Sequence, residues 1–266
     1  MRVLIAVDME GISGIVHWDQ VQPGHAEYAR FREIMTEEVN AAIDGALDGG
    51  ATGVVVTDGH ADGRNILIEK LRVPARLNSG SPAPLSMVEG VQHAQCVFFI
   101  GYHARANTPD AILCHTWNDQ VRGVWLNDQL VGEIGLNAAV CGSFGARVSL
   151  VTGDRAAVQE AIDLLGPIES VIVKTAQGRM SAECLAVEET RTAIRHAAAH
   201  AMVRQIPPFV IDPPIRLRVA LTLPDQIDHA LRVPGSNRID GVTLEWVGDD
   251  MVSVYHAFRA IVSLSR

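Results

Sequence analysis

The chain has 266 residues, of which 48% are hydrophobic and 20% charged, close to ordinary usage in globular proteins. This length can bury a large core, and the composition excludes both a disordered chain and a fibrous repeat. The formal net charge of −9 argues against a nucleic-acid partner, because phosphate binding requires clustered lysines and arginines.

The N-terminal apolar run is interrupted by Asp8 and Glu10, too early for a secretory signal peptide. The longest apolar stretches, such as residues 96–100, are far shorter than the roughly 20 residues that cross a bilayer. The four cysteines show no C-x-x-C spacing, so a zinc ribbon or redox pair is not indicated. We therefore expect a cytoplasmic protein with no membrane segment.

The first hundred residues alternate between predicted strands and one helix. Val3–Val7, Gly53–Thr57 and Cys96–Gly101 are short apolar runs typical of strands buried on both faces. Apolar residues at helical spacing predict a helix over Glu27–Leu47, which Gly49-Gly50 ends. A proline-containing, loop-rich stretch precedes the third strand.

The remainder of the chain continues this alternation. Asn127-Asp128 predicts a hairpin turn between two strands, and Gln177-Gly178 predicts a second turn. The other expected elements are strands at Arg147–Thr152 and Ser170–Lys174, helices at Gly132–Val140, Asp154–Leu165 and Val187–Val203, and a final strand, helix, strand and helix. This order predicts an α/β fold with a mostly parallel sheet flanked by helices. We expect a catalytic, metal-binding domain over residues 1–180 and a smaller α+β subdomain over residues 181–266.

Residue types that bind metals follow three predicted strands: Asp8 with Glu10, Asp58 with His60, and His103. Ligands of open α/β sheets gather at the carboxyl ends of strands, so these side chains could converge. Carboxylates mixed with imidazoles suit zinc and, less selectively, manganese or cobalt. Each residue alone is more often a turn former or helix cap.

Three further features are ambiguous when the residues are taken alone. Glu133 is expected at a helix start, where a carboxylate is favourable without any metal. Residues 58–69 nearly match a calcium loop, but we reject a calcium site because His60 is a poor calcium ligand and a strand precedes the loop. His196 and His200 lie four residues apart without the glutamate of an H-E-x-x-H motif, which favours an ordinary exposed helix face.

The motifs taken together resemble one known family, the D-aminopeptidases of dipeptide-transport operons. The matching segments are Val7-Asp8-Met9-Glu10-Gly11-Ile12-Ser13-Gly14, Asp58-Gly59-His60, Gly101-Tyr102-His103-Ala104-Arg105-Ala106, His115, and Val131-Gly132-Glu133-Ile134-Gly135-Leu136-Asn137-Ala138. Their order and context match over essentially the whole chain, including Lys174 and Arg179.

The resemblance implies two zinc ions per chain. Asp8 would bridge them, Glu10 and His60 would complete one site, and His103 and Glu133 the other, with a catalytic role for His115. It also implies a ring-shaped decamer whose interior admits only short peptides. One extra residue between His103 and His115 departs from the family pattern and affects the loop that carries His115.

The implied activity is hydrolysis of N-terminal amino acids, including D-residues, from short peptides by water that two zinc ions activate. The sequence does not choose among nucleophile, proton donor and oxyanion stabiliser for His115. It also does not determine the preferred stereochemistry. Two alternatives remain: a two-metal amidase or phosphoesterase acting on another small substrate, and a metal-stabilised binding protein without turnover.

Overall fold

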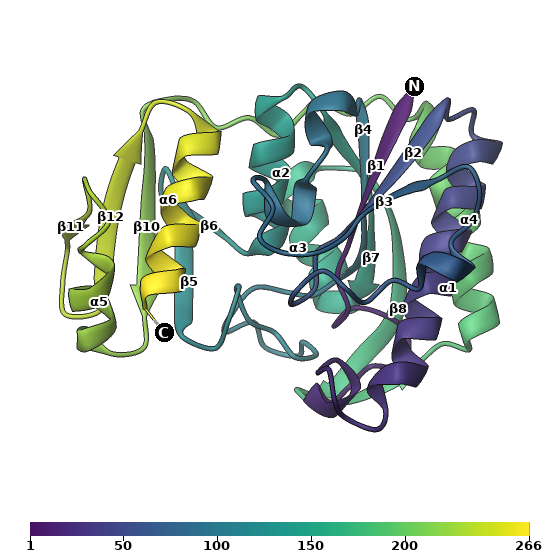
Figure 1. The fold of residues 1–266 in the computed structure, drawn as a ribbon, viewed down its shortest axis with the longest axis horizontal. Coiled ribbons are helices and arrows are strands. Elements are labelled where there is room, and N and C mark those ends of the chain that lie inside the picture. The colour runs from purple at the N-terminus through teal and green to yellow at the C-terminus, as the bar shows by residue number, and fades with distance from the viewer. Residues whose placement is uncertain (266) are drawn as a thin grey trace.

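The computed structural model describes residues 1–265, which form two sheets with their covering helices (Figure 1). The larger sheet is parallel except for its last pair, β8–β9. Its strand order is β3 (Arg76–Asn78), β2 (Gly53–Asp58), β1 (Arg2–Val7), β4 (Cys96–Tyr102), β7 (Arg147–Asp154), β8 (Glu169–Gly178) and β9 (Ser181–Cys184). The α/β prediction is confirmed.

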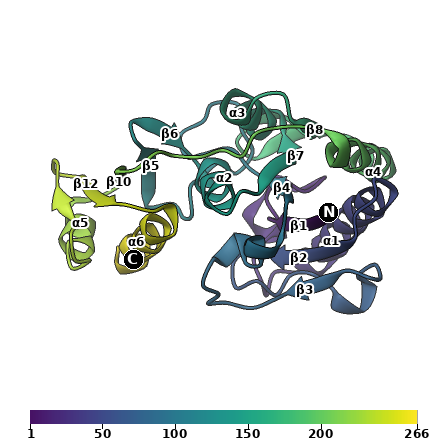
Figure 2. The same ribbon diagram turned by 90° about the horizontal axis from the view of Figure 1, so that it is seen from above.

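Helices cover both faces of the larger sheet, as seen from above in Figure 2. α1 (Tyr28–Asp48) and α4 (Val187–Val203) pack together on one face, and α2 (Glu133–Ser143) and α3 (Arg155–Leu165) lie on the other. Side chains of β1 alternate between the two resulting cores: Val3, Ile5 and Val7 enter one, and Leu4 and Ala6 the other. This explains why the central strands are continuous apolar runs.

The smaller sheet is antiparallel and lies beside the larger layer (Figure 1). Its strands are β11 (Asn237–Arg238), β12 (Thr243–Gly248), β10 (Ile215–Leu221), β5 (Val121–Leu126) and β6 (Gln129–Val131), accompanied by α5 (Pro224–Ala230) and α6 (Met251–Leu264). The expected division at residue 180 stays a prediction. The sheets themselves divide the chain elsewhere, because the β5–β6 hairpin joins the smaller sheet and α4 covers the larger one.

Two elements differ from the sequence-based expectation. The predicted turn at Gln177-Gly178 is wrong: β8 continues to Gly178, and the chain reverses at Arg179-Met180 into β9. This hairpin lies at the partly exposed sheet edge, where no apolar run marks the strands. β3 was not expected because three residues are too few to show a period.

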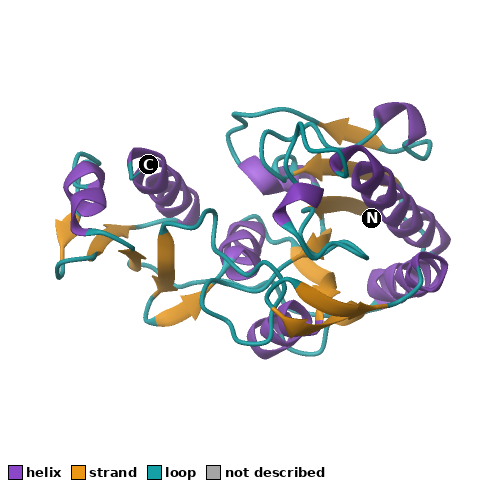
Figure 3. Cartoon of the chain, turned by 90° about the horizontal axis from the view of Figure 1, so that it is seen from below, coloured by secondary structure: helices purple, strands orange, loops and turns teal. Residues whose placement is uncertain are grey.

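Figure 3 shows the same arrangement from below, with strands in orange and helices in purple. Among residues 1–265, no helix is both long and apolar enough to span a membrane.

Candidate metal centre

The proposed ligands lie at the carboxyl edge of the larger sheet. β1 pairs in parallel with both β2 and β4, so the ends of the three strands meet. Asp8 follows β1, His60 lies just beyond β2, and His103 follows β4. Glu133 is the first residue of α2, which starts beside the same edge. Buried polar side chains thus gather from four separate segments.

A tight turn after β1 brings Glu10 to the same edge as Asp8. The Gly11 amide donates to the main-chain oxygen of Gly101 at 2.8 Å. A Cβ atom at Gly11 would lie 2.0 Å from the oxygen of Tyr102, which is impossible without moving the backbone. Glycine is therefore required where the turn passes β4, and the expected turn through Gly11 is present.

The buried side chain of Lys174 binds this turn through three hydrogen bonds. Its ammonium nitrogen Nζ lies 2.6, 2.8 and 2.7 Å from the main-chain oxygens of Glu10, Ile12 and Ile15. The side chain is buried, and this burial lowers the pKa of Lys174 to about 8, with the nearby carboxylate of Asp154 acting in the opposite direction. Three donors on one nitrogen match three acceptors, so Lys174 fixes the segment that carries Glu10. The residues alone predicted no role for it, although a lysine inside an apolar strand was a visible signal.

Asp8 lies between two histidines. Its Oδ1 atom is 3.3 Å from Nδ1 of His60, and its Oδ2 atom is 3.3 Å from Nε2 of His103. A second carboxylate faces each ring: Glu10 Oε2 is 3.0 Å from His60 Nδ1, and Glu133 Oε1 is 3.2 Å from His103 Nε2. The cluster is thus two carboxylate-imidazole groups that share Asp8.

The other nitrogen of each ring is bound by a main-chain carbonyl. Nε2 of His60 donates to the oxygen of Val21 at 2.9 Å, and Nδ1 of His103 donates to that of Ala104 at 3.0 Å. In the neutral rings, the nitrogens that face the carboxylates then carry lone pairs, which is the usual orientation of metal-binding histidines.

This cluster needs positive charge at its centre. Glu10 Oε2 and His103 Nε2 are buried and make no hydrogen bond within residues 1–265. Lone pairs and carboxylates that face each other without hydrogen are repulsive unless a cation lies between them. The donor set, carboxylate oxygen and imidazole nitrogen, suits zinc, so the residues present fit the metal that the sequence predicts.

The electrostatics of the cluster agree with this requirement. Burial alone would raise the pKa of Asp8, but the neighbouring imidazoles of His103 and His60 hold it well below its usual value. Burial would lower the pKa values of His60 and His103, but the neighbouring carboxylates, Glu10 and Glu133 foremost, raise both well above normal. Both shifts favour positive charge beside these carboxylates.

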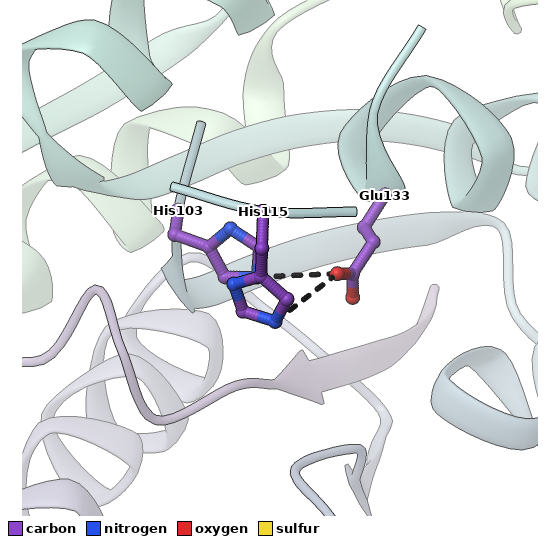
Figure 4. A group of neighbouring side chains, drawn as sticks. All are labelled: His103, His115 and Glu133. Carbon is purple, nitrogen blue, oxygen red and sulfur yellow. Dashed lines mark ion pairs between the residues drawn. The ribbon is translucent and has the colours of Figure 1, made fainter. Parts of the chain in front are cut away.

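His115 lies directly beside the cluster (Figure 4). Its ring stacks on His103 with centroids 4.0 Å apart and 11° between the planes, and Trp18 meets it edge-on at 5.4 Å. Nδ1 lies 2.9 Å from the main-chain oxygen of Leu113, and Nε2 lies 3.8 Å from Glu133 Oε1. His103, His115 and Glu133 could hold one ion between them, as could Asp8, Glu10 and His103.

Other residues that the sequence analysis considered lie elsewhere. The Asp58 carboxylate accepts the main-chain amides of Asn65 and Ile66 at 2.5 and 2.8 Å, so it shapes the loop after β2. His196 and His200 are exposed on α4. The His115 loop is held by Asp154, which accepts from the Ile112 amide, and by Glu133, which accepts from the Trp117 amide at 2.7 Å. No local pattern predicted these two contacts.

A cavity of about 800 Å³ opens over the cluster. Asp8, Glu10, His60 and Glu133 line it from the larger layer, and Arg259 and Ser263 line it from α6. The cavity therefore lies between the carboxyl edge of the larger sheet and α6, a helix that accompanies the smaller sheet. Its size suits a ligand of a few residues or a comparable small molecule.

Comparisons with known proteins give one consistent result. The model of a D-aminopeptidase family matches residues 1–260. A D-aminopeptidase of Bacillus subtilis (strain 168) is 35% identical over 269 residues, which cover 100% of this chain and 98% of the relative. A solved structure, the Zn-dependent D-aminopeptidase DppA from Bacillus subtilis, described as a self-compartmentalizing protease, matches with a TM-score of 0.97. It shares 34% identity and covers 100% of this chain and 98% of its own.

Proposed function

This chain belongs to the D-aminopeptidase family, and on that premise we propose that it is a zinc-dependent aminopeptidase that removes N-terminal D-amino acids from short peptides. The observation that carries the proposal is the position of Asp8. Its two carboxylate oxygens face different histidines, each of which also faces its own glutamate.

We propose two zinc ions per chain. Asp8, Glu10 and His60 would hold one ion, and Asp8, His103 and Glu133 the other. The buried atoms without hydrogen bonds, Glu10 Oε2 and His103 Nε2, support this assignment, because each belongs to a different ligand group. When bound, the metals supply Lewis acidity and lower the pKa of water, so that a nucleophile is available at neutral pH.

His115 is the residue that we assign to proton transfer. Its Nδ1 donates to the oxygen of Leu113, and stacking on His103 fixes the plane of the ring, so Nε2 is directed beside the metal ligands. A histidine held this way can accept a proton at Nε2 from the attacking water and pass it to the amine that leaves when the peptide bond breaks. Glu133 is oriented by the amide of Trp117, which keeps its carboxylate next to both imidazoles.

The assembly and location are also proposals. The related Bacillus subtilis protein is described as self-compartmentalizing, which supports a ring-shaped homo-oligomer, and we propose a decamer. Such an assembly would place the cavity in an enclosed space and limit access to short peptides. The cytoplasmic location is proposed from the sequence analysis.

The test is a panel of small substrates assayed with and without zinc. We expect metal-dependent release of alanine from D-dialanine, slower or no release from L-dialanine, and no hydrolysis of p-nitrophenyl phosphate. Phosphate ester hydrolysis without peptide hydrolysis would favour the two-metal phosphoesterase. Binding of zinc and peptide without release of any product would favour the binding protein.

A further inference from the structure

The cavity over the metal ligands is acidic on most sides. Asp8, Glu10 and Glu133 lie at its base, and the exposed carboxylates of Asp19, Asp62 and Asp119 lie around it. Among the described residues that line this cavity, Arg259 is the single lysine or arginine. Arg259 therefore places a guanidinium among these carboxylates.

Arg259 reaches the cavity from α6, in the smaller layer of the fold (Figure 1). Tyr255, one turn before Arg259, meets the Trp117 ring edge-on at 6.1 Å, and Phe258, the residue before Arg259, does so at 5.5 Å. The guanidinium lies over the Tyr255 ring, 5.9 Å from its centroid. Trp117 also donates its main-chain amide to Glu133. Trp117 therefore links α6 to a proposed metal ligand, and Trp117, Glu133 and Arg259 line the same cavity.

The hydrogen bonds of Arg259 leave part of its guanidinium without a partner. Nη1 donates to the main-chain oxygens of Ala83 and Pro84 at 2.8 and 2.9 Å. Within residues 1–265, no carboxylate forms an ion pair with this side chain, and neither Nε nor Nη2 makes a hydrogen bond or is fully buried. A half-buried cation without a counter-ion is costly, and the planar donors of a guanidinium match the two oxygens of a carboxylate.

We propose that Arg259 binds the C-terminal carboxylate of short peptides whose N-terminal residue lies at the metal centre. This inference rests on the proposed aminopeptidase function and adds a second determinant of specificity. An extended chain advances roughly 3.3–3.6 Å per residue. A peptide of a few residues therefore suits a cavity of about 800 Å³ that both Arg259 and the proposed metal ligands line. Arg259 would bind only peptides whose free C-terminal carboxylate lies within the same cavity as the N-terminal residue. This requirement would select short peptides at the active site.

The experiment compares D-dialanine with its C-terminal amide, using zinc-loaded protein of the full chain. For the wild type we expect kcat/KM to be about 10- to 100-fold higher for the acid than for the amide, as is typical of a charged hydrogen bond. In Arg259→Gln the acid-to-amide ratio should fall toward one, chiefly through a higher KM for the acid. Arg259→Lys retains the charge and should keep an intermediate ratio, which separates recognition from misfolding.

His256→Ala is the matched control. His256 is exposed on the same helix and bonds the same Pro84 oxygen at 3.1 Å, but it does not line the cavity. Its removal loosens the loop that contains Pro84 without changing the charge near the substrate, so we expect the wild-type acid-to-amide ratio.

Equal loss for acid and amide in Arg259→Gln, or the same change in His256→Ala, would overturn the inference. A wild type that cleaves acid and amide equally would also overturn it. Hydrolysis of neither would overturn the proposed function, and this inference with it.

Discussion

The ammonium group of Lys174 lies 2.6 Å from the main-chain oxygen of Glu10, across 164 positions of sequence. The contact joins the last parallel strand of the sheet, β8, to the turn after the first, β1. It matters for function because this turn determines where the Glu10 carboxylate lies relative to His60.

Our first prediction concerns this contact. Lys174→Met leaves three main-chain oxygens without their donor, and we expect a loss of about 3 kcal/mol in unfolding free energy. Thermal or denaturant unfolding measures it, and zinc analysis should show weaker retention at the Glu10 site. Lys70→Met is the control, since Lys70 pairs with Glu33 on the surface and its loss should change little. Equal destabilisation in the two variants would contradict the role of Lys174.

The sequence predicted the positions of Asp8, His60 and His103 for a physical reason. Each follows a buried apolar run, and the carboxyl ends of parallel strands meet at one edge of a sheet. Glu10 could be placed beside Asp8 only on condition that Gly11 makes a turn, which the structure contains. Glu133 and His115 were different, because a helix start and a loop histidine are ordinary features. Only the resemblance to a known family pointed to them.

The side-chain contacts around the site that the sequence did not predict are long-range. Lys174 meets the β1 turn through the order of the strands, and Arg259 reaches the cavity because α6 returns from the smaller sheet. β9 was not expected because an edge strand with mixed exposure lacks a clear period. The spacing of apolar residues along the chain indicates strands and helices. It does not indicate which distant residues line a cavity together.

The second prediction concerns proton release when zinc binds. Against the effect of burial, the neighbouring carboxylates raise the pKa values of His60 and His103 well above normal, which favours the protonated rings. Zinc requires their lone pairs, so binding should release protons and tighten as the pH rises toward these pKa values. Titration calorimetry in buffers of different ionisation enthalpy measures the release. Binding without proton release at neutral pH would refute the prediction.

The third prediction separates the two carboxylates that follow β1. Asp8 faces both histidines, whereas Glu10 faces His60 alone. Asp8→Asn should therefore reduce zinc content at both positions, and Glu10→Gln chiefly at one. Metal analysis after dialysis against a weak chelator tests this directly. If the two variants lose the same amount of zinc, Asp8 does not bridge.

The fourth prediction concerns assembly. We expect a homo-oligomer with a mass about ten times the 28.7 kDa of the chain, stable at micromolar concentration. Light scattering coupled to size exclusion measures the mass, and electron microscopy shows whether the particle is a ring. A monomer under these conditions would contradict the proposed compartment. That result would leave the proposed metal centre standing, since all of its proposed ligands come from one chain.

The last prediction concerns His115, whose ring is stacked on His103, a proposed metal ligand. His115→Ala should keep both zinc ions and the assembly but lose about 10²–10⁴-fold in kcat, the usual contribution of a positioned acid-base group. KM should change less, because the proton is transferred only as the peptide bond breaks. Trp18→Phe is a companion variant that retains an aromatic ring beside His115, so kcat should fall less in it.

Unchanged kcat in His115→Ala would remove this residue from the mechanism. Loss of one zinc would instead make His115 a ligand with His103 and Glu133, an arrangement that their spacing permits.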